Sequence, residues 1–289
     1  MKLNSVVIDN TFAEAFKMRY VRLLVTAIDA HWLQAAISAS TGCATSIIGC
    51  TVEAGLESCT NETPDGRPGA FLLFFARERE ILEKELIKRI GQTLLTCPTV
   101  SVFNGSSGGE LANIGARLRY FGDGHETEGE AYGRNVWEIP VSEGKFIVET
   151  KISINEGVAG GVFLIMAKTQ SAGLSAAKAA VEAIAPLPGT ITPFPGGVCR
   201  AASRIGSKYP FLKASTNTKF VPSLGPTLPA EVTCVYEIVI NGVDEPSVKA
   251  AMREGILSAV REPLITMISA PNFEGRLGSI KLHLHDIAG

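Results

Sequence analysis

The sequence lacks an excess of charge of either sign. Its 289 residues include 27 lysines and arginines against 29 aspartates and glutamates, which gives a formal net charge of −2. A general nucleic-acid binder needs a basic surface, and a protein that lies on membranes needs a cationic face. We therefore expect neither nucleic acid nor membrane among the partners of this chain.

Long apolar runs and paired cysteines are also missing. The longest apolar run, AFLLFFA (70–76), is too short to span a bilayer, and the opening MKLNSVVIDN has no apolar stretch typical of a secretory signal. The six cysteines form no C-x-x-C pair and lie mostly in or beside apolar segments, where a thiol behaves as a small hydrophobic group. These absences favour a cytoplasmic protein with reduced thiols and no cysteine-bound metal.

The sequence does contain enough apolar residues for a sizeable core. Hydrophobic residues make up 46% of the chain and charged residues 19%, as in globular proteins. In the first half, branched and aromatic runs predict strands at 20–27, 44–50, 70–76 and 94–103. Asp29 is placed to cap a helix that stops at Gly42, and Leu82, Leu86 and Ile90 recur at helical spacing in a second helix.

The second half repeats this order of elements. Strands are predicted at 161–168, directly after 189–198, at 233–240 and at 264–270. One helix, with apolar residues three or four apart from Leu174 to Ile184, ends before Pro186. The other begins near Glu245 and stops at Pro263.

Each half therefore reads β-α-β-β-α-β, the split βαβ or ferredoxin-like arrangement. We expect an α+β protein of two ferredoxin-like lobes related by internal duplication, at 1–150 and 151–289, with a hairpin at Glu143–Gly144 close to the boundary. The stretch 104–115 has the composition of a flexible loop. A sheet of this kind carries helices on one face only, so its other face meets water, a second sheet or another subunit.

One carboxylate interrupts the predicted strand at 233–240. Glu237 lies between Val235 and Val239, and because side chains alternate along a strand, all three point to one face. Burial raises the pKa of a carboxyl, which allows it to donate a proton and take it back near neutral pH. The alternative is a structural ion pair across a lobe contact, since ion-pair networks also hold buried carboxylates.

Eight phrases in collinear order resemble the formylmethanofuran:tetrahydromethanopterin formyltransferases. They are TFAEAF (11–16), ETPDGRPG (62–69), YFGDG (120–124), GVAGG (157–161), TPFPGG (192–197), KASTN (213–217), YEIVING (236–242) and HLHD (283–286). The resemblance implies two ferredoxin-like lobes. It also implies transfer of a formyl group between the amine of methanofuran and N5 of tetrahydromethanopterin, without metal or prosthetic group. The glutamate of YEIVING is the proposed catalytic carboxylate of the family, so the resemblance makes Glu237 the catalytic candidate.

The resemblance also implies partners. Archaeal members of this family form homotetramers and act in methanogenesis. Bacterial members act in formaldehyde oxidation, as one subunit of a formyltransferase/hydrolase complex. We therefore expect C1 carriers as substrates and a homo-oligomer, dimer or tetramer, or an assembly with hydrolase-complex subunits.

Two loops are candidates for substrate binding. Arg67 in ETPDGRPG is a candidate to clamp an acidic substrate tail through two parallel hydrogen bonds, and a rigid turn with a solvated arginine is the alternative. In TPFPGG, Phe194 offers a ring for stacking, and the segment from Pro195 through Gly196 and Gly197 admits close backbone approach. The alternative for Phe194 is a packed ring at a strand entry.

Three further polar residues, Lys208, Ser215 and Asn217, are candidates for holding polar groups of a cofactor-like substrate. His283 and His285 alternate along one predicted strand, but no carboxylate-and-histidine motif accompanies them, so we expect surface or interface histidines and no metal site.

One segment departs from the family pattern. SAPNFEGRLG (269–278) has Pro271 and Glu274 where glycines are usual in the family, which affects any glycine-dependent approach of the backbone. An active formyltransferase and a non-catalytic paralogue both remain open, the second as a pterin-binding or scaffolding subunit. The fold alone also allows a tandem ligand sensor.

Overall fold

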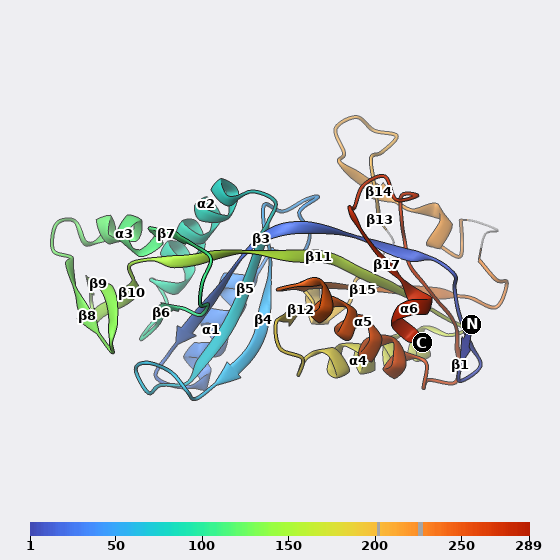
Figure 1. Cartoon of the computed structure of the whole chain (residues 1–289), viewed down its shortest axis with the longest axis horizontal. Helices are drawn as coiled ribbons and strands as arrows, with labels where there is room; N and C mark the ends of the chain where they lie inside the picture. The colour runs from blue at the N-terminus through green and yellow to red at the C-terminus, as the bar shows by residue number, and fades with distance from the viewer. Residues whose placement is uncertain (201–202, 225–227) are drawn as a thin grey trace. The chain divides into compact units, whose positions relative to one another are not determined.

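The chain divides into two units. The computed structural model describes residues 1–200, 203–224 and 228–289 (Figure 1). The middle unit is Met18–Glu156, and the terminal unit combines Met1–Lys17 with Gly157–Gly289. This division differs from a single cut at residue 150, because the first seventeen residues belong with the C-terminal part. The reason is strand pairing, since the N-terminal strands hydrogen-bond with strands from the end of the chain.

The middle unit contains a mixed sheet and three α-helices among the residues it comprises. Its first elements are β3 (Phe12–Thr26, whose second half lies here), α1 (Ala30–Thr41), β4 (Glu53–Thr60), β5 (Gly69–Ala76), α2 (Arg79–Arg89), the π-helical η1 (Ile90–Leu94) and β6 (Ser101–Asn104). The later ones are β7 (Glu110–Ala112), α3 (Ile114–Leu118), the 3₁₀ turn η2 (Arg119–Gly122), β8 (Thr127–Ala131), β9 (Arg134–Val141) and β10 (Gly144–Glu149). The strands lie in the order β4-β5-β3-β6-β10-β9-β8.

The terminal unit follows a similar plan. Its elements are β1 (Lys2–Leu3), β2 (Val6–Ile8), the start of β3, β11 (Ile152–Ala167), α4 (Gln170–Ile184), β12 (Thr190–Ile191), η3 (Pro195–Gly197), β13 (Ser203–Ile205), β14 (Ala214–Thr216), η4 (Thr218–Phe220), β15 (Cys234–Gly242), α5 (Glu245–Ala259), β16 (Ile265–Ser269), β17 (Ile280–His283) and α6 (Leu284–Ala288). The sheet order is β12-β15-β11-β16-β2-β1. Figure 1 shows α4 and α5 side by side along this sheet.

Each unit buries its own apolar core. In the terminal unit, alternate residues of β15, namely Tyr236, Ile238 and Ile240, pack with the apolar faces of α4 and α5. In the middle unit, β3 and β5 pack against α1 and α2 in the same way. Within the described part of the chain, no helix combines the length and the hydropathy needed to cross a bilayer.

Caps confirm the predicted starts of two helices and the end of the first one, whereas α5 ends at Ala259, before the predicted stop at Pro263. The Asp29 carboxylate accepts a hydrogen bond from the backbone N–H of Trp32 at 3.1 Å, and Gly42 follows the last turn of α1. Asp244 caps α5 in the same way through Ser247. The Asp29–Gly42 helix and the helix that begins at Glu245 therefore lie where local sequence signals predicted them.

Several local predictions are wrong. The 44–50 segment is a turn, in which the Glu53 carboxylate accepts the N–H of Ile47, and the strand comes after it as β4. Pairing in the 94–103 segment begins only at Ser101, because the helical periodicity continues through η1. The loop at 104–115 contains β7, which pairs with the start of β11. The second strand of the terminal unit was predicted directly after 189–198, but β12 lies within that segment and has only two residues.

The cysteines are also less buried than their apolar neighbours indicated. All six are free thiols; Cys43 and Cys59 are exposed, and the other four are partly exposed.

Phe163 provides a test of the terminal core. Its side chain is 0% exposed on β11, against Gly255 of α5. Phe163→Ala should lower the free energy of unfolding by about 3–5 kcal/mol, because it removes a buried ring and leaves a cavity. Phe211→Ala, whose ring is 80% exposed in the same unit, should change it by less than about 0.5 kcal/mol. Urea titrations followed by circular dichroism measure both, and equal effects would contradict this assignment of the core.

Candidate active site

Glu237 lies in the middle of β15, on the face of the sheet turned away from α4 and α5. Its neighbours Tyr236 and Ile238 point into the helix-covered core. Val235, on the same face as Glu237, belongs to a small apolar cluster with Leu164, Met166 and Val232. The carboxyl therefore lies at the border of an apolar patch, on the face that the sequence predicted.

The strands on either side fix the position of Glu237. Leu164 of β11 is its register partner on one side. On the other side Cys199 forms a bridge with it, in which the Cys199 N–H donates to the Glu237 carbonyl at 2.8 Å and the Glu237 N–H donates back at 3.0 Å. Register partners direct their side chains to the same face, so Leu164 and Cys199 flank the carboxyl.

Burial raises the pKa of Glu237 to about 7. Removal of water disfavours the charged carboxylate and favours the neutral acid. Near neutral pH both forms are then populated, which is what a group needs in order to donate a proton and accept one in the same reaction cycle.

The TPFPGG turn leads directly to this strand contact. Pro195 opens η3, and Gly196 and Gly197 follow with φ of +63° and +76°, a region that favours glycine. A Cβ atom on Gly197 would lie 2.6 Å from a methyl group of Val181, so this turn needs glycine for space as well. Two residues later the chain pairs with Glu237 through Cys199. The structure therefore brings the predicted turn, with the partly exposed Phe194, next to the Glu237 strand.

The other three candidates of the terminal unit lie in and beside the β13–β14 hairpin. The Ser215 hydroxyl donates to the carbonyl of Gly206 at 2.8 Å, and the Asn217 side chain accepts the N–H of Lys219 at 3.3 Å. Lys208 is exposed, with its ammonium 5.9 Å from the ring centre of Tyr209. Ser215 and Asn217 thus stabilise the local backbone, and their roles toward a substrate stay a prediction.

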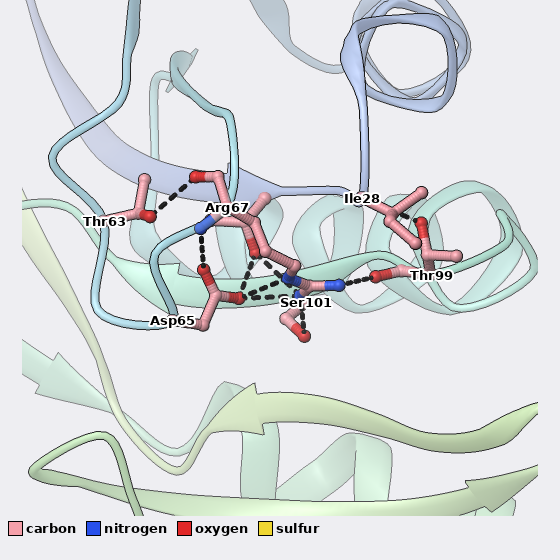
Figure 2. A network of polar contacts seen from close by, with 7 residues as sticks. Ile28, Thr63, Asp65, Arg67, Thr99 and Ser101 are labelled. Atoms are coloured by element: carbon pink, nitrogen blue, oxygen red, sulfur yellow. Dashed lines mark hydrogen bonds and ion pairs between the residues drawn. The ribbon is translucent and has the colours of Figure 1, made fainter.

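Arg67, in the middle unit, is held by the chain itself. Figure 2 shows its guanidinium among Asp65, Thr99 and Ser101. Its Nε donates to Asp65 at 2.9 Å, Nη2 donates to Asp65 and to Ser101 at 2.7 Å each, and Nη1 donates to the Thr99 carbonyl. Asp65 is desolvated, but hydrogen bonds from Thr26 and Arg67 and the charge of Arg67 lower its pKa. These contacts favour a rigid turn over a clamp that reaches for a substrate, but the arginine is bound by the chain and is not the solvated one of that alternative.

Sequence reasoning missed another carboxylate of the terminal unit, Glu14, which lies in the TFAEAF phrase and is buried. Glu14 is 6% exposed. Its two carboxylate oxygens accept hydrogen bonds of 2.6 to 2.9 Å from the backbone N–H groups of Phe273, Gly275, Leu277 and Gly278. Desolvation acts to raise its pKa, but the four hydrogen bonds together lower it. The available signal was a single carboxylate two residues from Phe12 and from Phe16, the same spacing of apolar residues that marked Glu237.

The histidines do not share one strand face as predicted. His283 ends β17, but His285 lies in α6 and contacts the carbonyl of Ile8 at 2.9 Å. Among residues 1–200, 203–224 and 228–289, no three His, Cys, Asp or Glu side chains gather closely enough to hold a metal ion.

Comparisons with known proteins find similarity to one family along nearly all of the chain. The sequence model named "Formylmethanofuran-tetrahydromethanopterin formyltransferase" matches residues 1–141, and the one named "FTR, proximal lobe" matches residues 144–287. The chain is 48% identical to the formylmethanofuran–tetrahydromethanopterin formyltransferase of Methanosarcina mazei, over 99% of this chain and 100% of that protein. It is also 48% identical to the enzyme of Methanopyrus kandleri, over the same shares.

Two solved structures are also similar. The formyltransferase of Methanosarcina barkeri superimposes with a TM-score of 0.94 at 46% identity, covering 99% of this chain and 100% of that one. A chain of the formyltransferase/hydrolase complex of Methylorubrum extorquens, solved with methylofuran, superimposes with a TM-score of 0.96 at 36% identity, covering 100% and 99%.

Glu14→Gln should destabilise the protein by roughly 2–4 kcal/mol, because the amide NH₂ cannot accept and leaves backbone donors without a partner. The pKa of Glu14 is lowered in the fold, so its contribution is present above the pKa of the unfolded state and is lost as pH falls through the folded value. Denaturant titrations at pH 7 and near pH 3 should therefore show a difference between variant and wild type that shrinks in acid. If the difference in stability between Glu14→Gln and wild type were the same at both pH values, Glu14 would not be ionised in the fold.

Glu237→Gln should have the opposite pH signature. The pKa of Glu237 is raised from 4.5 to about 7, so the stability that the neutral acid provides is present below the unfolded value and is lost as pH rises through the folded one. The amide does not ionise and avoids this loss. We expect the thermal midpoint of the variant to match wild type at pH 4 and to exceed it at pH 8, and scanning calorimetry measures both. A lower midpoint at pH 8 would indicate a structural ion pair.

Proposed function

The chain belongs to the formylmethanofuran–tetrahydromethanopterin formyltransferase family, and we propose that it moves a formyl group between N-formylmethanofuran, or an analogue, and N5 of tetrahydromethanopterin. The observation that carries this proposal is Glu237, a carboxyl whose burial raises its pKa to about 7 beside the glycine turn of TPFPGG. Relatives of this name match the chain over their full length.

The reaction requires one proton to move from the attacking nitrogen to the leaving amine. The pterin nitrogen attacks the formyl carbon, a C–N bond forms, and the carbonyl oxygen becomes an oxyanion in a tetrahedral intermediate. The C–N bond to methanofuran then breaks. The attacking nitrogen loses a proton and the leaving amine gains one. A carboxyl with a pKa close to the working pH serves both transfers, and in its neutral form it donates a hydrogen bond to the oxyanion.

The fold supports two ferredoxin-like lobes related by duplication. In the middle unit the strands of the β-α-β-β-α-β segment lie in the spatial order β6-β3-β5-β4, and in the terminal unit the order is β16-β11-β15-β12. Numbered by their place within each segment, both orders are fourth, first, third, second. The same arrangement in both units favours duplication over chance.

The assembly is a further part of the proposal. The similarity to a chain of a formyltransferase/hydrolase complex favours hydrolase-complex subunits as partners, and a homo-oligomer is the other arrangement that we expect. A pterin-binding or scaffolding subunit without turnover remains the alternative, because Glu274 has φ of +62°, a strained value, in a segment where the family pattern has glycine.

Formyl transfer itself tests the proposal. The purified chain is mixed with N-formylmethanofuran and tetrahydromethanopterin, and the pterin absorbance is followed. We expect wild-type turnover, and for Glu237→Gln a fall in kcat of ~10²–10³-fold with KM nearly unchanged, since the amide can neither give up nor take the proton that the two transfers need. The wild-type profile of kcat/KM against pH should show an apparent pKa near 7 that disappears in the variant.

Glu231→Gln is the matched control. Glu231 is a surface carboxylate of the same unit, paired with Lys168 at 2.7 Å, and its loss should leave kcat unchanged. Near-normal turnover in Glu237→Gln would remove Glu237 from the mechanism. Binding of both carriers without any transfer would support the scaffolding alternative.

A further inference from the structure

Two cysteines of the middle unit lie at the two ends of the turn that joins α1 to β4. Cys43 directly follows Gly42, the residue that ends α1, and Cys50 lies shortly before the first residue of β4. Cys43 is exposed and Cys50 is partly exposed. Small molecules in solvent therefore have access to this pair of thiols.

Backbone hydrogen bonds hold the turn between the two cysteines in one shape. The Cys50 N–H donates to the carbonyl of Ser46 at 2.7 Å. Next to Cys43, the carbonyl of Ala44 accepts the N–H of Ala54 at 2.9 Å, which ties the start of the turn to β4. The separation of the two cysteines is therefore set by the fold.

Cys43 is held in a strained conformation. Its φ is +51°, in the left-handed region that residues other than glycine, asparagine and aspartate rarely adopt. The Arg89 guanidinium donates to the carbonyls of Gly42 at 2.9 Å and of Cys43 at 3.3 Å, which keeps the backbone in place there. Because the exposed side chain of Cys43 gains little from burial, packing does not account for a cysteine at this position. Strain of this kind is a sign of function.

The two thiols are in contact. Cys43 makes a side-chain hydrogen bond to the sulfur of Cys50, and the Thr45 hydroxyl oxygen lies 3.9 Å from the same sulfur. Desolvation acts to raise the pKa of Cys50, but backbone hydrogen bonds from Thr45 and Ser46 and the side-chain bonds from Thr45 and Cys43 together lower it. These bonds favour the thiolate, which is the nucleophilic form of cysteine. A nucleophilic thiol beside a second, accessible thiol is typical of redox-sensing cysteines.

We propose that Cys43 and Cys50 form a dithiol site that hydroperoxides oxidise to a disulfide. The Cys50 sulfur attacks one oxygen of the hydroperoxide, the O–O bond breaks, and the other oxygen leaves with the thiol proton as an alcohol, or as water when the oxidant is hydrogen peroxide. Cys50 is then a sulfenic acid. The Cys43 sulfur attacks the Cys50 sulfur, the S–S bond forms, and the sulfenic oxygen leaves as water with the Cys43 proton.

This oxidation is complete in protons and electrons. Two thiols give up two electrons and two protons, and the hydroperoxide takes them up as one alcohol and one water. Thiol–disulfide exchange with a small thiol returns the pair to its reduced form. The site involves neither substrate of the proposed function, so the two proposals stand or fall separately.

Oxidation of the reduced, full-length protein by one equivalent of hydrogen peroxide tests the site. Free thiols are blocked with one alkylating reagent, the disulfide is reduced, and the released thiols are labelled with a second reagent. Tandem mass spectrometry should then find the second label on Cys43 and Cys50. Cys43→Ser should stop at the sulfenic acid of Cys50, which dimedone traps. Cys50→Ser should consume peroxide about tenfold more slowly than wild type, because the more nucleophilic thiol is gone.

Cys59→Ser is the matched control. Cys59 is another exposed thiol of the middle unit, and its loss should leave the disulfide and the rate of peroxide consumption unchanged. Circular dichroism verifies that each variant is folded. The wild-type labelling does not depend on any variant, so it decides the proposal even if a serine variant folds poorly.

Three results would overturn the site. In the first, wild type keeps both thiols free after oxidation. In the second, the second label falls on a pair other than Cys43 and Cys50. In the third, dimedone labels Cys59 as fast as it labels Cys50 in Cys43→Ser, which would show general reactivity of exposed thiols and no special role for this turn.

Discussion

The desolvation of a carboxylate inside an apolar β-sheet is the constraint on which the terminal unit depends, and the protein resolves it in two opposite ways. Four backbone N–H groups surround Glu14 and lower its pKa, so it is held as an anion that ties a loop to a strand. At Glu237 desolvation dominates and the pKa rises to about 7. The number of donors facing the group thus separates a structural carboxylate from one suited to proton transfer.

The anchoring by Glu14 explains how the 269–278 segment accommodates its unusual residues. Glu274 has a positive φ of +62°, which fits the glycine of the family pattern, and the bonds that Glu14 makes on both sides of it stabilise that backbone. Where space is absent, glycine is kept. A Cβ atom on Gly278 would lie 2.7 Å from the carbonyl oxygen of Ala15. The departures therefore occur where the loop has room and a strong acceptor holds its shape.

Local signals in the sequence predicted the helices, the long strands and Glu237, because each depends on spacing within a few residues. They failed where the outcome depends on partners far along the chain. The first strands join the C-terminal part through pairing with β16 and β17, which no local pattern indicates. Glu14 and Glu237 carry the same pattern, and only the distant loop that donates to Glu14 separates their roles. The clamp predicted for Arg67 likewise ignored acceptors at Thr99 and Ser101, which lie more than thirty positions away.

Those acceptors give Arg67 a different significance. Its guanidinium joins the ETPDGRPG loop to Thr99 and Ser101, and the hydroxyl of Thr63 donates to the Arg67 carbonyl at 2.6 Å. Thr63 in turn lines a pocket of about 660 Å³ in the middle unit. A charged group fixed by several hydrogen bonds loses little further entropy when a ligand arrives, and it holds the neighbouring backbone in one shape. The arginine therefore acts through the loop that it stiffens, and the part of the pocket lining that this loop supplies is held in one shape with it.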